Sequence, residues 1–170
     1  IYAIRRELVG PIQPGVTDDF FNSTGAIAQG YRLVFARDAI AYEAVAASSK
    51  KEFGRKVRVI TRGLRAVLLR RNLLNPFRYG FYALQLLSHK LLRRLVIFPL
   101  MGLLLVTPWL WSQGLFYQLF ALGQLGLYGC AAAGWVLKDF RPGQLKLFTL
   151  PFYFCLVNVA CLLAAIHVLR

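Results

Sequence analysis

Two adjacent carboxylates near the start of the chain are the residues best suited to acid–base chemistry. Asp18 and Asp19 follow Thr17 and are two of only seven acidic side chains in a protein of formal charge +14. A carboxylate can take the proton of a hydroxyl group as that group attacks an electrophile. The same residues also suit a helix start, because threonine is a good N-cap and aspartates favour the positive end of the helix dipole. Alone, the motif is more typical of a helix start than of an active site.

The segments around this motif predict strand, helix and strand in turn. Residues 1–8 begin as a short apolar strand, and a helix is expected from Thr17 with Gly30 as its C-cap. Further short strands are expected at 31–35 and 39–42. This order is typical of the end of an α/β sheet domain, yet roughly 50 residues of it bury too little apolar surface to fold alone. Because the sequence also starts at Ile1 and not at Met, we expect the sheet to continue upstream.

A basic amphipathic stretch follows. Arginines recur at three- and four-residue steps, at Arg55, Arg58, Arg62 and Arg65. This spacing predicts a helix in the plane of the membrane interface with its arginines at headgroup level, and a solvated charged face is the alternative. Asn75-Pro76 interrupts the pattern, and a second amphipathic stretch runs on to Arg94. His89 in that stretch is expected to be an interfacial side chain.

The composition indicates a membrane protein, since 58% of the residues are hydrophobic and the mean hydropathy is +0.52. Three apolar segments predict transmembrane helices at about 95–111, 115–137 and 147–169. Lysine and arginine precede the first span and occupy the loop between the second and third, whereas the other loop has none. The positive-inside rule therefore predicts that residues 1–94 and the loop at 138–146 are cytoplasmic and that the C-terminus is outside. With the basic residues beside the spans, we expect anionic membrane lipid as a partner and no nucleic acid.

Four stretches, taken in order, resemble a known family. IYAIRREL, VTDDF, QGYRLVF and RKVRV, followed by an amphipathic segment and membrane spans, resemble the C-terminal half of membrane-bound family-2 glycosyltransferases. That group contains cellulose, hyaluronan and poly-N-acetylglucosamine synthases. The resemblance implies the C-terminal part of a GT-A (Rossmann-like) catalytic domain at 1–54, basic amphipathic interface helices at 55–94 and a three-helix transmembrane region at 95–170. The expected fold class is therefore α/β plus membrane α-helical, in a bacterial enzyme of polysaccharide biosynthesis.

The resemblance also implies site residues. Asp19 stands where the family has its catalytic base, with Asp18 in a supporting position that is Glu in the family. Arg58 and Arg55 fall in the motif of the diphosphate or acceptor region, where Arg55 replaces the expected Gln and Val59 the expected Trp. These two replacements depart from the processive synthases.

The implied reaction is an inverting transfer from a nucleotide-sugar donor to a glycan or a lipid-linked acceptor at the cytoplasmic membrane face. It would use a divalent cation, Mg²⁺ or Mn²⁺, whose Asp-x-Asp ligands are expected upstream of Ile1 because the sequence contains no such motif. The fragment by itself is therefore expected to be inactive.

Two other classes remain open. One is a non-enzymatic basic membrane protein that binds anionic lipid or partner helices, in which Asp18 and Asp19 only cap a helix. The other is a transporter subunit, for which Asn158 and His167 inside the third span are the only hints of a polar path.

Overall fold

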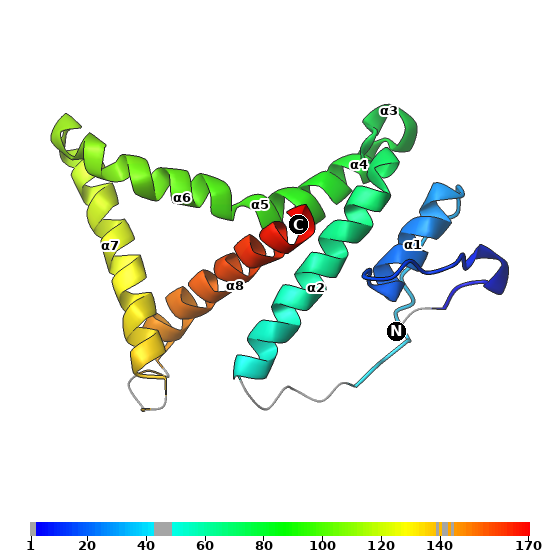
Figure 1. The fold of residues 1–170 in the computed structure, drawn as a ribbon, viewed down its shortest axis with the longest axis horizontal. Coiled ribbons are helices and arrows are strands. Elements are labelled where there is room, and N and C mark those ends of the chain that lie inside the picture. The colour runs from blue at the N-terminus through cyan, green and yellow to red at the C-terminus, as the bar shows by residue number, and fades with distance from the viewer. Residues whose placement is uncertain (1–2, 43–48, 139, 141–142, 144) are drawn as a thin grey trace. The chain divides into compact units, whose positions relative to one another are not determined.

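The predicted sheet is the main point at which the structure corrects the sequence analysis. A computed structural model describes residues 3–42, 49–138, 140, 143 and 145–170, and the regular elements in this part of the chain are all helical (Figure 1). The α/β fold class is therefore wrong for the described residues, which contain no Rossmann-like sheet. The chain divides into two compact units, one of Ile1–Arg93 with Ala164–Arg170 and one of Arg94–Leu163.

The segments expected to be strands take other conformations. Residues 6–8 form a short 3₁₀ helix, η1 (Arg6–Leu8), and residues 31–42 are an irregular, largely exposed segment. Val34 and Phe35 in that segment are 88% and 85% exposed. A strand is stable only when a neighbouring strand accepts and donates its backbone hydrogen bonds. The apolar run at 31–35 has no such neighbour among the described residues, so its sequence pattern does not become a strand.

The predicted first helix is present with the predicted end. Helix α1 (Asp18–Ala28) has Thr17 as its N-cap. At the other end Gly30 has φ of +86°, and the backbone N–H groups of Gly30 and Tyr31 donate to the carbonyls of Ile27 and Ala26, both at 3.0 Å. These two bonds form a Schellman motif, which requires a left-handed residue where Gly30 stands.

Helix α2 (Ser49–Leu69) is the basic helix, and its apolar side belongs to the core of the first unit. Val67 is fully buried against Leu73 and Leu86, which come from η2 (Arg71–Leu74) and α4 (Phe81–Leu86). The expected break at Asn75-Pro76 is confirmed. Asn75 caps α3 (Pro76–Tyr79) by accepting the Phe77 N–H at 3.0 Å, and Pro76 occupies the first helical turn.

The second amphipathic stretch is less regular than its sequence pattern predicts. After α4 the chain forms a π-helix, η3 (Leu87–Leu92), and then a single turn, α5 (Arg93–Leu95). A π-helical segment places one extra residue in the turn, so the side chains after it are rotated relative to an ideal α-helix. This rotation affects Lys90, which belongs to the candidate site.

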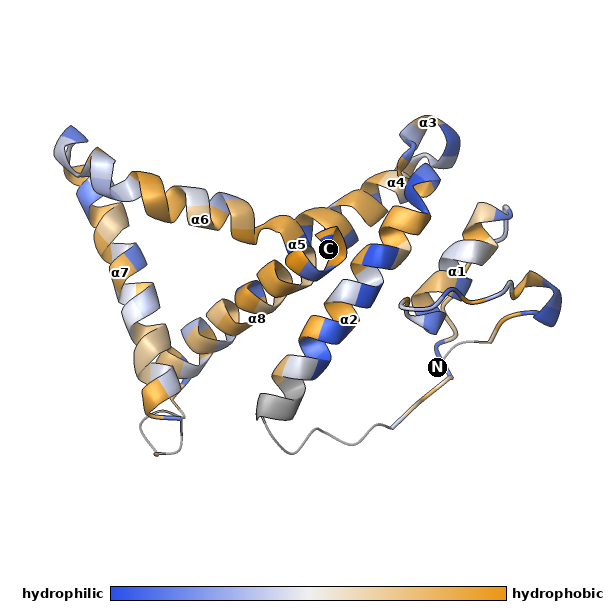
Figure 2. Ribbon diagram, in the orientation of Figure 1, coloured by the Kyte–Doolittle hydropathy of each residue, from blue (hydrophilic) through white to orange (hydrophobic). Residues whose placement is uncertain are grey.

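The second unit contains the apolar helices. Helices α7 (Leu115–Val136) and α8 (Lys146–Leu169) are each long and apolar enough to cross a membrane, judged by length and composition. They agree with the predicted spans 115–137 and 147–169, and they are largely hydrophobic along their length (Figure 2). The segment predicted at 95–111 is divided between α6 (Ile97–Val106) and the 3₁₀ helix η4 (Thr107–Gln113). It gives a third candidate span only if it is joined to Phe81–Leu95, across a bend of 44°.

Candidate functional site

The two aspartates lie in the first turn of α1, and both are exposed. The Thr17 side chain makes no capping hydrogen bond, and the first turn is closed by the Phe21 N–H donating to the Thr17 carbonyl at 2.9 Å. The Asp19 carboxylate accepts the Phe20 N–H at 2.7 Å through Oδ1. Neither aspartate forms an ion pair with any residue that the structure describes. Both carboxylates therefore remain open to solvent.

The start of α1 is held against α2 by apolar contacts. Val16, just before the aspartates, and Phe21, just after them, form a buried cluster with Ala66 of α2. A helix turns about 100° per residue, so Asp18 projects from nearly the same side of α1 as Phe21, whereas Asp19 lies about 100° further round. Asp18, the residue expected to be supporting, is thus closer to the α2 side than Asp19 is.

Arg70 forms the closest polar approach to α1. Its guanidinium carbon lies 4.3 Å from the centroid of the Phe21 ring, a cation–π arrangement. A Cβ atom added at Gly25 would lie 2.9 Å from an Nη of Arg70, so the glycine leaves room for the guanidinium. The Arg70 Nε is buried and makes no hydrogen bond among the described residues. Arg70 is therefore packed on α1 by its ring contact.

A pocket of about 450 Å³ lies beside the loop that leads into α1. Gln13, Pro14 and Val16 line it from this loop, and Arg65, Leu68 and Leu69 line it from α2, with Val168 completing the wall. Arg65 donates to the His167 carbonyl at 3.1 Å, and its other Nη would be 3.1 Å from a Cβ at Gly15. The volume is in the range of small-molecule sites. Its lining combines the cation Arg65 and the amide of Gln13 with apolar side chains, among them Val16, which lies two residues before Asp18.

Lys90 approaches the same helix from η3. Its Nζ lies 4.8 Å from the centroid of the Phe20 ring, and Phe20 directly follows Asp19. Next to it, the Ser88 Oγ and His89 Nδ1 are 2.9 Å apart, and the Ser88 hydroxyl is 2.8 Å from the Leu84 carbonyl. His89 is exposed, as expected for an interfacial side chain.

The arginines expected at the donor site are on α2 but away from the aspartates. Arg55 and Arg58 are exposed. Arg58 lies eight residues before Ala66, the point where α1 packs, which corresponds to about 12 Å along the helix axis. The structure thus brings Arg65, Arg70 and Lys90 to the start of α1, and it does not place Arg58 there.

Sequence reasoning missed these three cations for identifiable reasons. Arg65 belongs to the same periodic run as Arg55 and Arg58, so periodicity alone does not distinguish it. Arg70 follows the last residue of α2, and its only signal is Gly25 in the middle of α1, a residue that helices avoid unless something packs closely there. Lys90 is displaced by the π-helical turn, which an α-helical period does not reveal.

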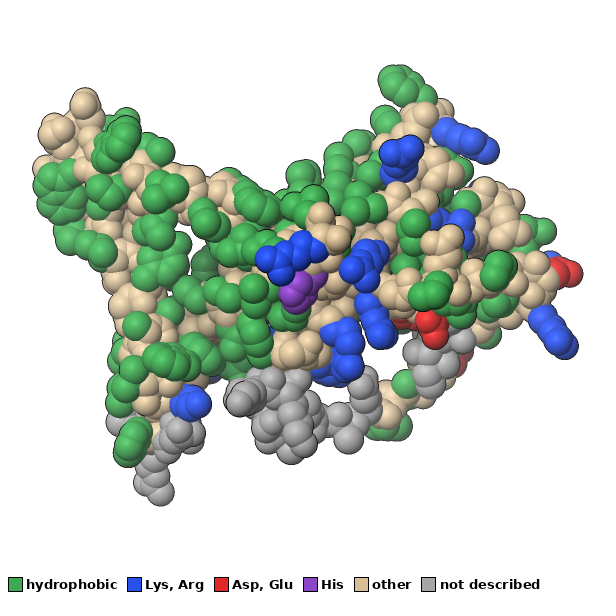
Figure 3. All heavy atoms as spheres, viewed as in Figure 1, with side chains coloured by type: hydrophobic (Ala, Val, Ile, Leu, Met, Phe, Trp, Pro, Cys, Tyr) green, Lys and Arg blue, Asp and Glu red, His purple; other side chains and the backbone are tan. Residues whose placement is uncertain are grey.

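The charges of the first unit are strongly unbalanced. Arg5–Glu7, at 3.9 Å and largely exposed, is the one ion pair between described residues. Figure 3 shows Lys and Arg side chains gathered on the face that carries α2, with few acidic side chains among them. No group of three His, Cys, Asp or Glu side chains suited to a metal occurs among the described residues. They therefore do not provide the ligands for the divalent cation that the resemblance implies.

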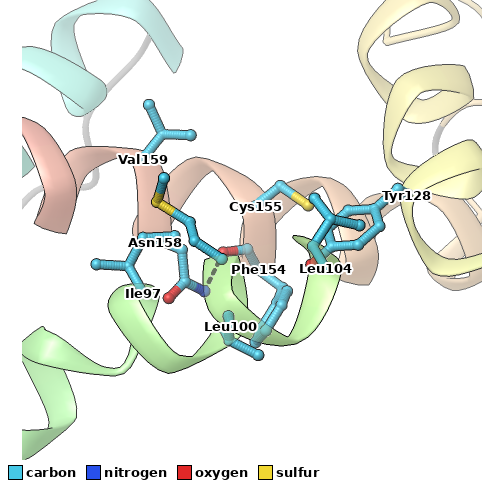
Figure 4. A pocket seen from close by; sticks show the side chains of 9 residues that line it. Ile97, Leu100, Leu104, Tyr128, Phe154, Cys155, Asn158 and Val159 are labelled. Atoms are coloured by element: carbon cyan, nitrogen blue, oxygen red, sulfur yellow. Dashed lines mark hydrogen bonds between the residues drawn. The ribbon is translucent and has the colours of Figure 1, made fainter. Parts of the chain in front are cut away.

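A separate pocket of about 250 Å³ lies inside the second unit (Figure 4). Its lining is apolar apart from Asn158, and it includes Ile97 and Leu100 of α6, Tyr128 of α7 and Phe154 of α8. The Asn158 amide donates to the Phe154 carbonyl of its own helix at 2.8 Å. This local bond satisfies a buried donor of Asn158 within its own helix.

Comparison with known proteins gives no relative. No protein-family model, no curated protein and no solved structure matches the chain. The class that the fold defines is therefore a helical protein with two apolar helices long enough to cross a membrane, preceded by a basic helical unit.

Proposed function

We propose that the protein transfers a sugar from a nucleotide-sugar donor to a glycan or lipid-linked acceptor. The observation that supports this best is the pair of exposed carboxylates, Asp18 and Asp19, which form no ion pair with a described residue although the surrounding unit is rich in arginine. A general base must lie within reach of its substrate, and Val16, three residues before Asp19, lines a pocket of about 450 Å³.

Asp19 is the proposed base. Its Oδ1 is held by the Phe20 N–H, which leaves Oδ2 to take the proton of an acceptor hydroxyl. The hydroxyl oxygen then forms a bond to the anomeric carbon, while the bond from that carbon to the diphosphate breaks and the leaving group keeps the electron pair. Asp18 supports the base. Arg58 and Arg55, which lie about 12 Å or more along α2 from the point where α1 packs, are the proposed contacts for the part of the diphosphate or acceptor furthest from Asp19.

The proposed site lies on the cytoplasmic face of the membrane. The distribution of lysine and arginine supports a cytoplasmic position for residues 1–94. The predicted placement of the C-terminus on the opposite side disagrees with the structure, because Arg65 donates to the His167 carbonyl and both belong to the first unit. A nucleotide sugar made in the cytoplasm would then reach Asp19 without crossing the bilayer.

The test is a transfer assay on membranes from cells that express the complete gene product, with a panel of radiolabelled nucleotide sugars. Asp19→Asn should lower the rate by at least about 100-fold, because the amide cannot accept the proton. Asp38→Asn is the matched control, since Asp38 is an exposed aspartate in the extended segment and should tolerate the change. Wild-type activity in Asp19→Asn, with equal membrane insertion, would refute the base. Absence of transfer from every sugar in the wild type would refute the function.

A further inference from the structure

Helix α2 has two chemically different sides. Its periodic arginines form one exposed stripe, which we call the arginine stripe: Arg55, Arg58, Arg62 and Arg65. Steps of three, four and three residues keep these side chains within one side of an α-helix. Leu64 and Val67, on the opposite side, are buried at 4% and 0% exposure. Leu64 and Val67 are thus buried while the arginines are exposed, although Val59, Leu68 and Leu69 are about half exposed.

The apolar side of α2 is already occupied by the protein itself. Val67 packs with Leu73 and Leu86, and Ala66 packs with Val16 and Phe21 of the α1 region. An interfacial helix ordinarily inserts its apolar side among the acyl chains. That orientation is closed to Leu64 and Val67, because exposing them to lipid would first require α1 and η2 to detach. What α2 offers to a partner is the arginine stripe together with the half-exposed side chains of Val59, Leu68 and Leu69.

Two arginines in the middle of the stripe have no counter-charge among the described residues. Arg58 and Arg62 form no ion pair with any described residue. Arg65 donates one Nη to the His167 carbonyl and is otherwise exposed. Several like charges on one exposed helix side repel each other and destabilise the helix slightly. A surface that supplies several negative charges at the same spacing would relieve this repulsion.

We propose that the arginine stripe docks α2 flat onto the anionic phospholipid headgroups of the membrane in which α7 and α8 are anchored, with the helix axis above the acyl chains. Charge complementarity selects this partner, and the two membrane-crossing helices keep the bilayer within reach of the stripe at all times. The docking is electrostatic, so it differs from insertion in being weakened by salt. It is independent of the transferase activity, although Arg58 takes part in both proposals.

The test uses the full chain in nanodiscs, with Cys130, Cys155 and Cys161 changed to serine and a fluorophore on Val59→Cys, an exposed position next to Arg58. A nitroxide on the lipid headgroup quenches the fluorophore when α2 is docked. Quenching should be stronger with phosphatidylglycerol than with phosphatidylcholine alone, and salt should remove the difference. Each arginine near an anionic surface contributes about 1 kcal/mol, so Arg58→Gln with Arg62→Gln should lower the docking equilibrium about 30-fold.

The control pair is Arg71→Gln with Arg78→Gln, which removes the same charge from exposed positions outside the stripe. This pair should leave quenching close to wild type. The Arg62→Lys variant keeps the positive charge, so its α2 should still dock, which separates loss of charge from misfolding. Circular dichroism measures the helix content of each variant. Equal quenching of the wild type in phosphatidylglycerol and in phosphatidylcholine would overturn the proposal. An equal loss of quenching in the stripe pair and in the control pair would also overturn it. Tighter binding of an oligonucleotide than of anionic lipid to the arginine stripe would overturn the proposal as well.

Discussion

The guanidinium carbon of Arg70 lies 4.3 Å from the centroid of the Phe21 ring, where the end of α2 meets α1. Two opposing effects act on this contact. A desolvated cation–π contact contributes about 0.5–2 kcal/mol, and a buried donor without a partner, such as the Arg70 Nε, costs about 1–3 kcal/mol. Since these nearly cancel, the charge of Arg70 adds little net stability. Phe21 provides the main apolar contact between the two helices.

Phe21→Ala and Arg70→Met should therefore differ sharply. Phe21→Ala removes a buried ring from the cluster with Val16 and Ala66 and should destabilise the first unit by about 3 kcal/mol. Arg70→Met keeps the aliphatic stem while removing the orphan donor, so it should leave stability unchanged or slightly raised. Thermal unfolding in detergent, followed by circular dichroism, measures both. A larger loss in Arg70→Met than in Phe21→Ala would show that the charge holds the helices together.

Gly30 is the position at which the end of α1 depends on a glycine. Its φ of +86° is costly for a residue with a Cβ, so Gly30→Ala should destabilise the first unit by about 1 kcal/mol. Gly54→Ala is the matched control. Gly54 lies inside α2 with open space where a Cβ would be added, so Gly54→Ala should stabilise the helix by about 1 kcal/mol. Relative to wild type, the unfolding midpoint should fall in Gly30→Ala and rise in Gly54→Ala. A higher midpoint in Gly30→Ala would contradict the Schellman motif.

Local signals in the sequence predicted local structure well. The Asn75-Pro76 break and the Gly30 cap both rest on backbone chemistry within a few residues, and both are present. The strands were predicted from equally clear patterns and are absent from the described residues. A helix forms its hydrogen bonds internally, whereas a strand depends on a partner that its own sequence does not specify. Leu33 and Val34 illustrate this, since these two consecutive apolar residues are 57% and 88% exposed.

The candidate site was only partly predictable for the same reason. Asp18 and Asp19 were found because their type and rarity are visible in the sequence. The cations that approach α1 depend on how α2 and η3 pack, which a periodic pattern does not encode. Arg65 and Arg70 are five residues apart, yet both reach the α1 region because one faces the Gly15 loop and the other follows the end of the helix.

The proposed topology predicts which sides of the membrane are accessible. In a background with serine at the three native cysteines, Arg170→Cys should react with a membrane-impermeant maleimide on intact cells. Lys138→Cys should react only after permeabilisation, because basic loops are retained in the cytoplasm. The reverse pattern would put the C-terminal end of α8 on the cytoplasmic side together with residues 1–94, in agreement with the contact between Arg65 and the His167 carbonyl in the first unit. Labelling of both sites in intact cells would mean that an even number of crossings separates them.

The packing of the two apolar helices depends on Gly134. A Cβ at this position would lie 2.5 Å from the Phe148 carbonyl oxygen and 3.1 Å from the Phe152 Cβ, both on α8. The three glycines that the sequence shows at three-residue steps, Gly123, Gly126 and Gly129, have no atom within 4 Å of such a Cβ. Close helix approach in membranes relies on small residues at the contact, so the contact glycine is Gly134 and not the spaced series.

Gly134→Ala should therefore separate α7 from α8 and lower the thermal midpoint of the detergent-solubilised protein. The atoms that the new Cβ would meet belong to the α8 backbone, which cannot rotate away as the end of a side chain can. The free energy of unfolding should therefore fall by about 2 kcal/mol, in the range measured for overpacked cores. Gly129→Ala is the control on the same helix, and the open space around it should make the change neutral or stabilising. Disulfide trapping between cysteines placed at Ala133 and Phe152 should become slower in Gly134→Ala and stay unchanged in Gly129→Ala. Equal midpoints and equal trapping in the two variants would contradict the contact between Gly134 and α8.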